Sequence, residues 1–445
     1  MSLERQSLDS LREALDRLEH GFDALPEAPP MPLDAAGRDV LLEVAERMRD
    51  NFPYFHPLYA GQMLKPPHPV ARAAHALAAW VNPNNHALDG GRASSRMEKE
   101  AVAEIARMFG WQEHLGHLAS GGTMANLEAL WVAGKLKPGM RVAASRQAHY
   151  THQRIGAVLG LEFVAVECDA RGRMDLADLE RKLAMVNIGT VVATMGTTAT
   201  GSVDPLPEIL ALREKHGFRV HADAAYGGYF GLVDNLRAET ATSFSRMGEV
   251  DSIVIDPHKH GLQPYGCGCV LFRDPGVGRL YKHDSPYTYF SSSELHLGEI
   301  SLECSRPGAS AVALWATQRL LPLQRGGEFA RGLARGREAA LALHEKISAD
   351  PRFVAGFAPE LDIVTWAVRA ETTTASSQRA RAVFEEAGRR GLHLALAELP
   401  ATFFAFARSG VKVDSATVTC LRSVLMKPEH ADWLDRIWDL LGRSL

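Results

Sequence analysis

The chain has 445 residues, of which 46% are hydrophobic and 23% are charged, a composition typical of a globular protein with a large core. Its net charge of -4 excludes a basic nucleic-acid-binding surface, and no apolar run approaches the roughly 18 residues of a membrane-spanning helix. The five cysteines are scattered, which argues against a disulfide framework and for a reducing compartment. We therefore expect a cytoplasmic protein without nucleic-acid or membrane partners.

The first predicted element is an amphipathic helix within residues 1–20. Leu8, Leu11, Leu15 and Leu18 recur at helical spacing on one face. This face could pack on its own chain or on a partner subunit. The same residues lack the apolar core of a signal peptide.

A regular alternation of helices and strands begins near residue 97. Amphipathic stretches predict helices over 96–110 and 124–136. The predicted strands are 141–145, 162–168, 190–196, 219–225, 251–256 and 267–272. Helical stretches separate most of them, which indicates a mostly parallel sheet covered on both faces. Ligands of such sheets bind at the carboxyl ends of the strands.

The pattern changes after residue 329. A long charged helix is predicted over 330–347, followed by a strand at 362–368 and a final helix over 429–442. These elements indicate a second, smaller α/β domain. The predicted parts are an N-terminal helical segment (1–85), a large α/β domain (86–325) and a small C-terminal α/β domain (326–445).

Residues with polar chemistry lie at the ends of several predicted strands. Gly121, Gly122 and Thr123 precede a helix, where free amides and a hydroxyl form an anion site. Asp223 lies at the end of one strand, and Lys259 follows another. Each has a simpler explanation: a structural turn, a buried partner for another side chain, or a solvated lysine.

Two further residues complete the pattern. His149 lies at a strand end, where its ring could stack on a flat heteroaromatic ligand, and Thr198 lies at another. A phosphate cradle, a carboxylate, an aromatic lid, hydroxyls and a lysine are together the requirements of pyridoxal 5′-phosphate. Lys259 would form an imine with its aldehyde, and Asp223 would keep its pyridine nitrogen protonated.

Other kinds of protein fit the sequence less well. A metal site is a competing explanation, because several histidines lie nearby, but they show no recognised ligand spacing on one helix. These histidines are His149, His152, His221, His258 and His260. We therefore predict no metal. A non-catalytic scaffold that keeps the fold is opposed by the intact Lys259, Asp223 and His149.

The order of motifs SGGT, QAH, GTT, HADAA and DPHK resembles the group II pyridoxal-phosphate-dependent amino acid decarboxylases. That family includes aromatic amino acid, glutamate, tyrosine/aspartate and histidine decarboxylases. The resemblance spans roughly residues 50–430. It implies the PLP-dependent transferase fold type I, with a large seven-stranded α/β domain, a small C-terminal α/β domain and an N-terminal segment wrapped on a partner subunit. A homodimer with its active site at the interface is therefore expected.

The same resemblance assigns a role to each cofactor-binding position. Lys259 matches the lysine that holds the cofactor, and Asp223 the aspartate on the ring nitrogen. His149 matches the stacking histidine that faces the reacting carbon, and Ala225 the residue beneath the ring. The expected cofactor-binding residues are Gly121, Gly122, Thr123, His149, Thr198, Asp223, Ala225, His258 and Lys259.

The resemblance assigns the substrate-binding positions less completely than the cofactor-binding ones. Arg422 resembles the small-domain arginine that meets the substrate α-carboxylate; the alternative is a surface arginine on the last strand. The family's catalytic loop carries a tyrosine that protonates the α-carbon, and Tyr289 is the expected counterpart, with Tyr287 as the alternative. His260 departs from the aromatic or aliphatic residue expected after the lysine.

The expected reaction is decarboxylation of an L-amino acid to the amine and CO2. Residues that would suit an aromatic substrate are Phe52, Tyr54, Phe55 and Trp80, whereas His86 and Arg92 would suit an acidic one. We expect an aromatic L-amino acid. The alternatives are an acidic amino acid, or another carbon–carbon lyase or aminotransferase on the same fold.

Overall fold

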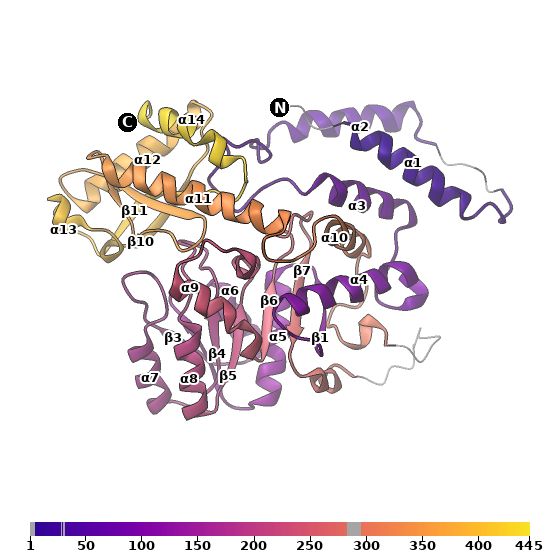
Figure 1. Cartoon of the computed structure of the whole chain (residues 1–445), viewed down its shortest axis with the longest axis horizontal. Helices are drawn as coiled ribbons and strands as arrows, with labels where there is room; N and C mark the ends of the chain where they lie inside the picture. The colour runs from indigo at the N-terminus through magenta and orange to yellow at the C-terminus, as the bar shows by residue number, and fades with distance from the viewer. Residues whose placement is uncertain (1–4, 28, 30–31, 283–294) are drawn as a thin grey trace.

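Two β-sheets organise the computed structural model, which describes residues 5–27, 29, 32–282 and 295–445 (Figure 1). The larger sheet has seven strands in the order β1-β7-β6-β5-β4-β2-β3. Its strands are β1 (Leu115–Ala119), β2 (Arg141–Ser145), β3 (Phe163–Val166), β4 (Ile188–Thr194), β5 (Arg219–Asp223), β6 (Ser252–Ile255) and β7 (Gly268–Phe272). β7 pairs antiparallel with β1 and β6, and the remaining pairs are parallel.

The described residues contain fourteen α-helices, most of which surround or connect the sheets. Those of the first half are α1 (Ser7–His20), α2 (Ala35–Met48), α3 (Pro69–Val81), α4 (Leu88–Met108), α5 (Gly122–Leu136), α6 (Thr151–Leu159) and α7 (Leu176–Met185). Those of the second half are α8 (Leu206–His216), α9 (Ala238–Ser245), α10 (Ala309–Leu320), α11 (Glu328–Ala349), α12 (Thr373–Arg389), α13 (Phe406–Ser409) and α14 (His430–Gly442).

The pleat of the larger sheet divides its side chains between two layers of helices. Val142 and Ala144 of β2 pack with Leu130 of α5 and Ile155 of α6. Ala143, which points to the opposite face, belongs to the main core with residues of α7 and α8. Because both faces are covered, β4 is buried along its whole length. The predicted mostly parallel seven-stranded sheet is therefore confirmed.

The smaller sheet is antiparallel, with the order β10-β11-β9-β8. Its strands are β8 (Phe353–Ala355), β9 (Ile363–Val368), β10 (Ala395–Pro400) and β11 (Thr417–Val424). Trp366 lies at the centre of its core, where it is fully buried. Ile363 and Val424 belong to the core of the larger sheet, so packing is continuous between the two sheets. The proposed domain boundaries remain predictions.

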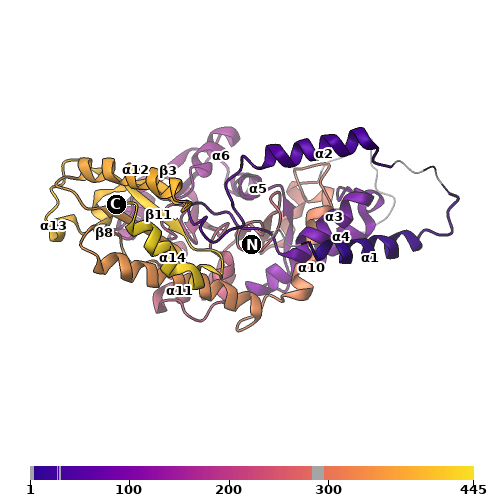
Figure 2. The same ribbon diagram turned by 90° about the horizontal axis from the view of Figure 1, so that it is seen from above.

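The N-terminal helices lie apart from both sheets. Figure 2 shows α1 and α2 well separated from each other in the right-hand half of the view, with α2 at the upper edge. The predicted first helix is confirmed as α1, which contacts α3, but neither α1 nor α2 has a buried residue. Within the described ranges, no helix combines the length and the apolar character needed to cross a membrane.

Candidate active site

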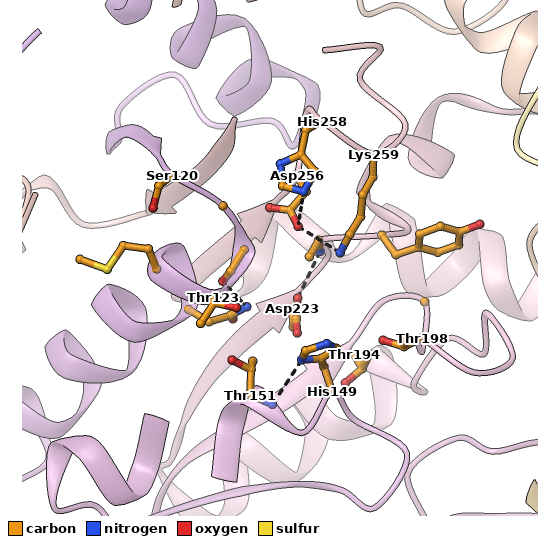
Figure 3. Close-up of a pocket in the computed structure, with 17 residues that line it drawn as sticks. Ser120, Thr123, His149, Thr151, Thr194, Thr198, Asp223, Asp256, His258 and Lys259 are labelled. Carbon is orange, nitrogen blue, oxygen red and sulfur yellow. Dashed lines mark hydrogen bonds and ion pairs between the residues drawn. The ribbon is translucent and has the colours of Figure 1, made fainter. Parts of the chain in front are cut away.

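A cavity of about 330 Å³ lies where β4, β5 and β6 end, opposite the start of α5 (Figure 3). All nine residues predicted to bind a cofactor line it: Gly121, Gly122, Thr123, His149, Thr198, Asp223, Ala225, His258 and Lys259. They come from five separate segments of the chain. The parallel strands end at one edge of the sheet, which brings these segments together.

The turn before α5 places the first backbone amides of that helix at this cavity. α5 begins at Gly122, and no side chain among the described residues caps its N-terminus. The first amides of a helix have no partner within the helix, so they attract an anion. The turn is held tightly against the sheet: a Cβ on Gly122 would lie 2.6 Å from Asp256 Oδ2, and a Cβ on Gly268 would lie 2.5 Å from the carbonyl carbon of Gly121.

Asp223 is the last residue of β5, and its buried carboxylate accepts two hydrogen bonds. His152 Nε2 donates to Asp223 Oδ2 at 2.8 Å, and the Ala225 amide donates to Oδ1 at 3.2 Å. Burial acts to raise the pKa of Asp223, but the His152 hydrogen bond and nearby positive charge outweigh it and hold the pKa below its usual value. Asp223 is therefore an anion at neutral pH and can face a protonated ring nitrogen.

Lys259 lies in the connection after β6. Its Nζ is 3.0 Å from Asp256 Oδ2, and Figure 3 shows Lys259 and Asp223 pointing into the same cavity. Asp256 is buried, and its Oδ1 has no hydrogen-bond partner among the described residues. Sequence reasoning missed Asp256, although its position three residues before the lysine was a usable signal.

Two histidines line opposite parts of the cavity as neutral rings. His149 Nδ1 accepts a hydrogen bond from the Thr151 amide at 3.2 Å, and His258 Nδ1 donates to the Cys267 carbonyl at 2.8 Å. Burial lowers the pKa of both imidazoles. A neutral, flat ring at His149 is suited to stacking on a heteroaromatic ligand.

Arg422 lies beside the cavity, buried within β11 with 4% of its surface exposed. It donates from Nε to the Ala199 carbonyl at 3.0 Å, from Nη2 to the Thr198 carbonyl at 2.6 Å, and from Nη1 to the Gly61 carbonyl at 3.1 Å. The alternative of a surface arginine is therefore wrong. A hollow that adjoins the cavity is lined by Arg422 together with His149 and Thr198.

The remaining candidates are not part of the cavity lining in this chain. His86 lies instead beside residues Leu297–Glu299 (the short helix η4), with its backbone carbonyl accepting from the Gly298 amide at 2.9 Å. Its role in substrate binding stays a prediction. The other such residues are Phe52, Tyr54, Phe55, Trp80 and Arg92. Tyr287 and Tyr289 lie outside the described residues.

The residues present fit pyridoxal phosphate. Uncapped amides suit its phosphate, a buried carboxylate suits its ring nitrogen, and a lysine amine in the same cavity suits its aldehyde. Within the described part of the chain, histidine, cysteine and acidic side chains form no group of three or more that could hold a metal ion.

Comparison with known proteins agrees with this chemistry. Residues 134–369 match the pyridoxal-dependent decarboxylase conserved domain, which is more than half of the chain. An L-tyrosine decarboxylase of Enterococcus faecium is 28% identical, covering 76% of this chain and 73% of its own. An L-aspartate decarboxylase of Thermococcus kodakarensis is 31% identical, covering 63% of this chain and 72% of its own. The crystal structure of Oryza sativa TDC with pyridoxal phosphate and tryptamine matches with a TM-score of 0.79 at 18% identity, covering 100% of this chain and 98% of that one.

The chain therefore belongs to the pyridoxal-dependent decarboxylase family. The expected family and the type I fold are confirmed. The protein is a carboxy-lyase that uses pyridoxal phosphate to decarboxylate an amino acid.

Proposed function

We propose that the substrate is an aromatic L-amino acid, which loses its α-carboxylate as CO2 and leaves as the amine. Two observations support this choice: the similarity to an L-tyrosine decarboxylase, and the hollow beside the cavity. Tyr150, Leu396 and Ala397 line that hollow with apolar surface. Its Arg146 is paired with Glu167 at 2.7 Å, and Arg422 is held by carbonyl groups, so both cations are already engaged.

The cofactor positions divide the work of binding and activation. The Lys259 amine would hold the aldehyde carbon, and the turn at Gly121–Thr123 would hold the phosphate. Asp223 would keep a proton on the ring nitrogen. Pyridoxal phosphate, when bound, supplies an electron-withdrawing ring that accepts the electron pair left behind as CO2 departs. The observation that carries this assignment is the presence of Lys259, Asp223 and an uncapped helix start around one cavity.

The side chains around the ring would select the bond that breaks. His149 would stack on one face and Ala225, which has a small side chain, would lie under the other. A Cα–carboxylate bond held perpendicular to the ring is the one that breaks, because its electrons then enter the ring system. Such orientation is worth several kcal/mol in well-aligned reactions. Thr198 would lie at the ring edge and His258 near the phosphate.

Arg422 would contact the substrate carboxylate through a single remaining donor. A guanidinium has five N–H groups. Four of them have acceptors here: the carbonyls of Ala199, Thr198 and Gly61, and Gln62 Oε1 at 3.4 Å. The contact would therefore be one charge-assisted hydrogen bond, which leaves the carboxylate free to turn perpendicular to the ring.

Tyr289 would donate the proton that replaces CO2 at the α-carbon. This assignment is supported by the resemblance to the family's catalytic loop. Tyr289→Phe should lower kcat with little effect on cofactor binding, and Tyr287→Phe is the matched control. Equal loss of kcat in both variants, or in Tyr287→Phe alone, would exclude Tyr289 as the donor.

We also propose that the chain works as a homodimer in the cytoplasm, with α2 at the subunit interface. α2 has no buried residue, and it exposes Leu41 (58%) and Met48 (62%), which is unusual for a helix that meets only water. Leu41→Glu should shift the particle mass from dimer to monomer in light scattering. Val158→Glu, at an exposed position of α6, is the matched control and should remain a dimer. A monomeric wild type would end this proposal.

A substrate panel tests the proposed specificity. L-tyrosine, L-tryptophan, L-phenylalanine, L-aspartate and L-glutamate are each incubated with the holoenzyme, and CO2 and amine are measured together. An aromatic substrate should give kcat/KM at least about tenfold above the acidic ones, since one well-filled pocket is worth that much. The second candidate, aspartate, is favoured by the similarity to the L-aspartate decarboxylase. Preferential release of β-alanine would establish it instead.

A further inference from the structure

We propose that His152 is a positioning residue for the reaction: it orients the Asp223 carboxylate and supports its negative charge, so that the ring nitrogen of the cofactor stays protonated. The proposal deepens the role of Asp223 and rests on it. Its basis is one buried side-chain pair that joins the start of α6 to the end of β5.

The geometry leaves one side of the Asp223 carboxylate for a ligand. His152 is fully buried in the first turn of α6, and its Nε2 lies 2.8 Å from Asp223 Oδ2. The Ala225 amide lies 3.2 Å from the other oxygen. The two donors hold the carboxylate plane, while Asp223 still lines the cavity. A carboxylate has about four acceptor positions, so capacity for a ring N–H remains.

The hydrogen-bond role of His152 follows from its partners. An ionised carboxylate only accepts hydrogen bonds, so the Nε2 of His152 carries the proton. Nδ1 is buried and has no hydrogen-bond partner among the described residues. His152 therefore acts on Asp223 as a hydrogen-bond donor through Nε2, and the carboxylate keeps its other acceptor positions for the ring nitrogen.

The neighbouring histidine shows what a purely structural role looks like. His221 is equally buried, but both of its ring nitrogens have partners: Asn126 Oδ1 at 2.8 Å and Ser252 Oγ at 2.9 Å. His152 leaves one ring nitrogen unsatisfied, which lowers stability relative to an apolar ring of similar size. A residue that costs stability and contacts a catalytic carboxylate fits a functional role better than a packing role.

Titratable groups from several elements surround Asp223. The groups that face it are His152 on α6, His221 on its own strand, and Lys259 and His149 at the cavity. When bound, the cofactor would be joined to Lys259 through its aldehyde. The hydrogen bond from His152 would then be a fixed protein contact that supports the negative charge of Asp223 opposite the ring nitrogen.

The experiment compares wild type, His152→Phe, His152→Met and His152→Gln as holoenzymes. Pyridoxal phosphate labelled with ¹⁵N in the ring is bound, and its ¹⁵N chemical shift is followed from pH 6 to 9. The wild type should stay protonated throughout. Phe and Met, which lack a donor, should move the deprotonation of the ring nitrogen down by at least one pH unit and raise the Kd for the cofactor about tenfold. Gln, whose amide can donate, should lie between these variants and wild type.

The outcomes distinguish a failure of the positioning role of His152 from a failure of the role of Asp223. His152→Phe should unfold at the same temperature as wild type or a higher one, because it removes an unsatisfied buried nitrogen. His221→Gln is the matched control, and its ¹⁵N titration should follow wild type. A ring titration in His152→Phe or His152→Met that coincides with wild type would overturn the positioning role. A wild-type ring nitrogen that is unprotonated, or unaffected by Asp223→Asn, would instead overturn the role of Asp223.

Discussion

Replacement of Gly268 by alanine tests whether the turn before α5 holds the cofactor phosphate. Gly268 is in β7, opposite Ala119, and is not part of the cavity lining. A Cβ there would lie 2.5 Å from the carbonyl carbon and 2.7 Å from the Cα of Gly121. Ordinary Cβ contacts begin near 3.4 Å, so the backbone of Gly121 must move by about 0.9 Å. The amides that follow it at the start of α5 move with it.

The magnitude of the effect follows from the contacts that this movement disturbs. Overpacking of a well-packed region costs about 1–3 kcal/mol of folding stability. One hydrogen bond to a charged group contributes about 1.5–3 kcal/mol, so its loss weakens binding roughly 10- to 100-fold. The assay is a titration of the apoenzyme with pyridoxal phosphate, followed by absorbance, alongside thermal unfolding of the same samples.

Gly116→Ala is the matched control for this experiment. Gly116 lies on β1, next to the same strand, and its Cβ would lie 2.5 Å from Leu271 Cδ2, on the far side from the cofactor turn. It should lose comparable stability and keep the wild-type Kd for the cofactor. A Gly268→Ala protein with reduced stability but an unchanged Kd would refute the assignment of the phosphate site.

Three other predictions follow from the site and the core. Lys259→Ala should abolish the visible absorbance of the lysine-bound cofactor together with turnover, and a yellow, active variant would contradict its role. Arg422→Met should raise KM about 10- to 100-fold with a smaller change in kcat, as expected for the loss of one charge-assisted hydrogen bond. Arg422→Lys should recover part of the lost affinity, and an unchanged KM in Arg422→Met would exclude the carboxylate contact. Burial, with the nearby charge of Lys427, lowers the pKa of His430 to about 3. Below about pH 6.5 the unfolded chain binds a proton at this histidine and the native chain does not. The stability that neutral His430 contributes to the native state is therefore complete above that pH and is lost as the pH falls toward 3. The free energy of unfolding should drop by about 2 kcal/mol between pH 7 and 5 on this account, and urea unfolding of His430→Gln should lack that drop; an equal drop in both proteins would refute it.

The larger sheet was largely predictable because six of its strands are short apolar runs. β1 was missed: its sequence, LGHLA, has Gly116 and His117 at its centre, which resemble a loop more than a strand. The glycine is required there, because Leu271 on β7 leaves no room for a Cβ. The need for it arises only once β1 and β7 are paired.

The residues that line the cavity were predictable in two ways. His149, Thr198, Asp223 and Lys259 lie at strand ends, and parallel strands end together, whereas the turn at 121–123 was found from its place before a helix. The partners of those residues were less accessible. His152 and Asp223 are 71 positions apart, and their contact depends on α6 crossing toward the end of β5. The burial of Arg422 was also not predictable from the sequence. Seven consecutive residues of β11 are buried, so no alternation of apolar and polar residues indicates which face of the strand is buried.

The direction of β7 has a consequence for how the reactive amine is held. β6 ends at Ile255 and β7 returns antiparallel beside it from Gly268, so the intervening loop is anchored at both ends in one sheet. Lys259 therefore lies in a connection between two paired antiparallel strands, and not in a crossover helix. Arg422 belongs to the smaller sheet, but its hydrogen bonds to the Thr198 and Ala199 carbonyls tie its guanidinium to the connection that follows β4. The lysine amine and this guanidinium are therefore both anchored to the edge where the larger sheet ends.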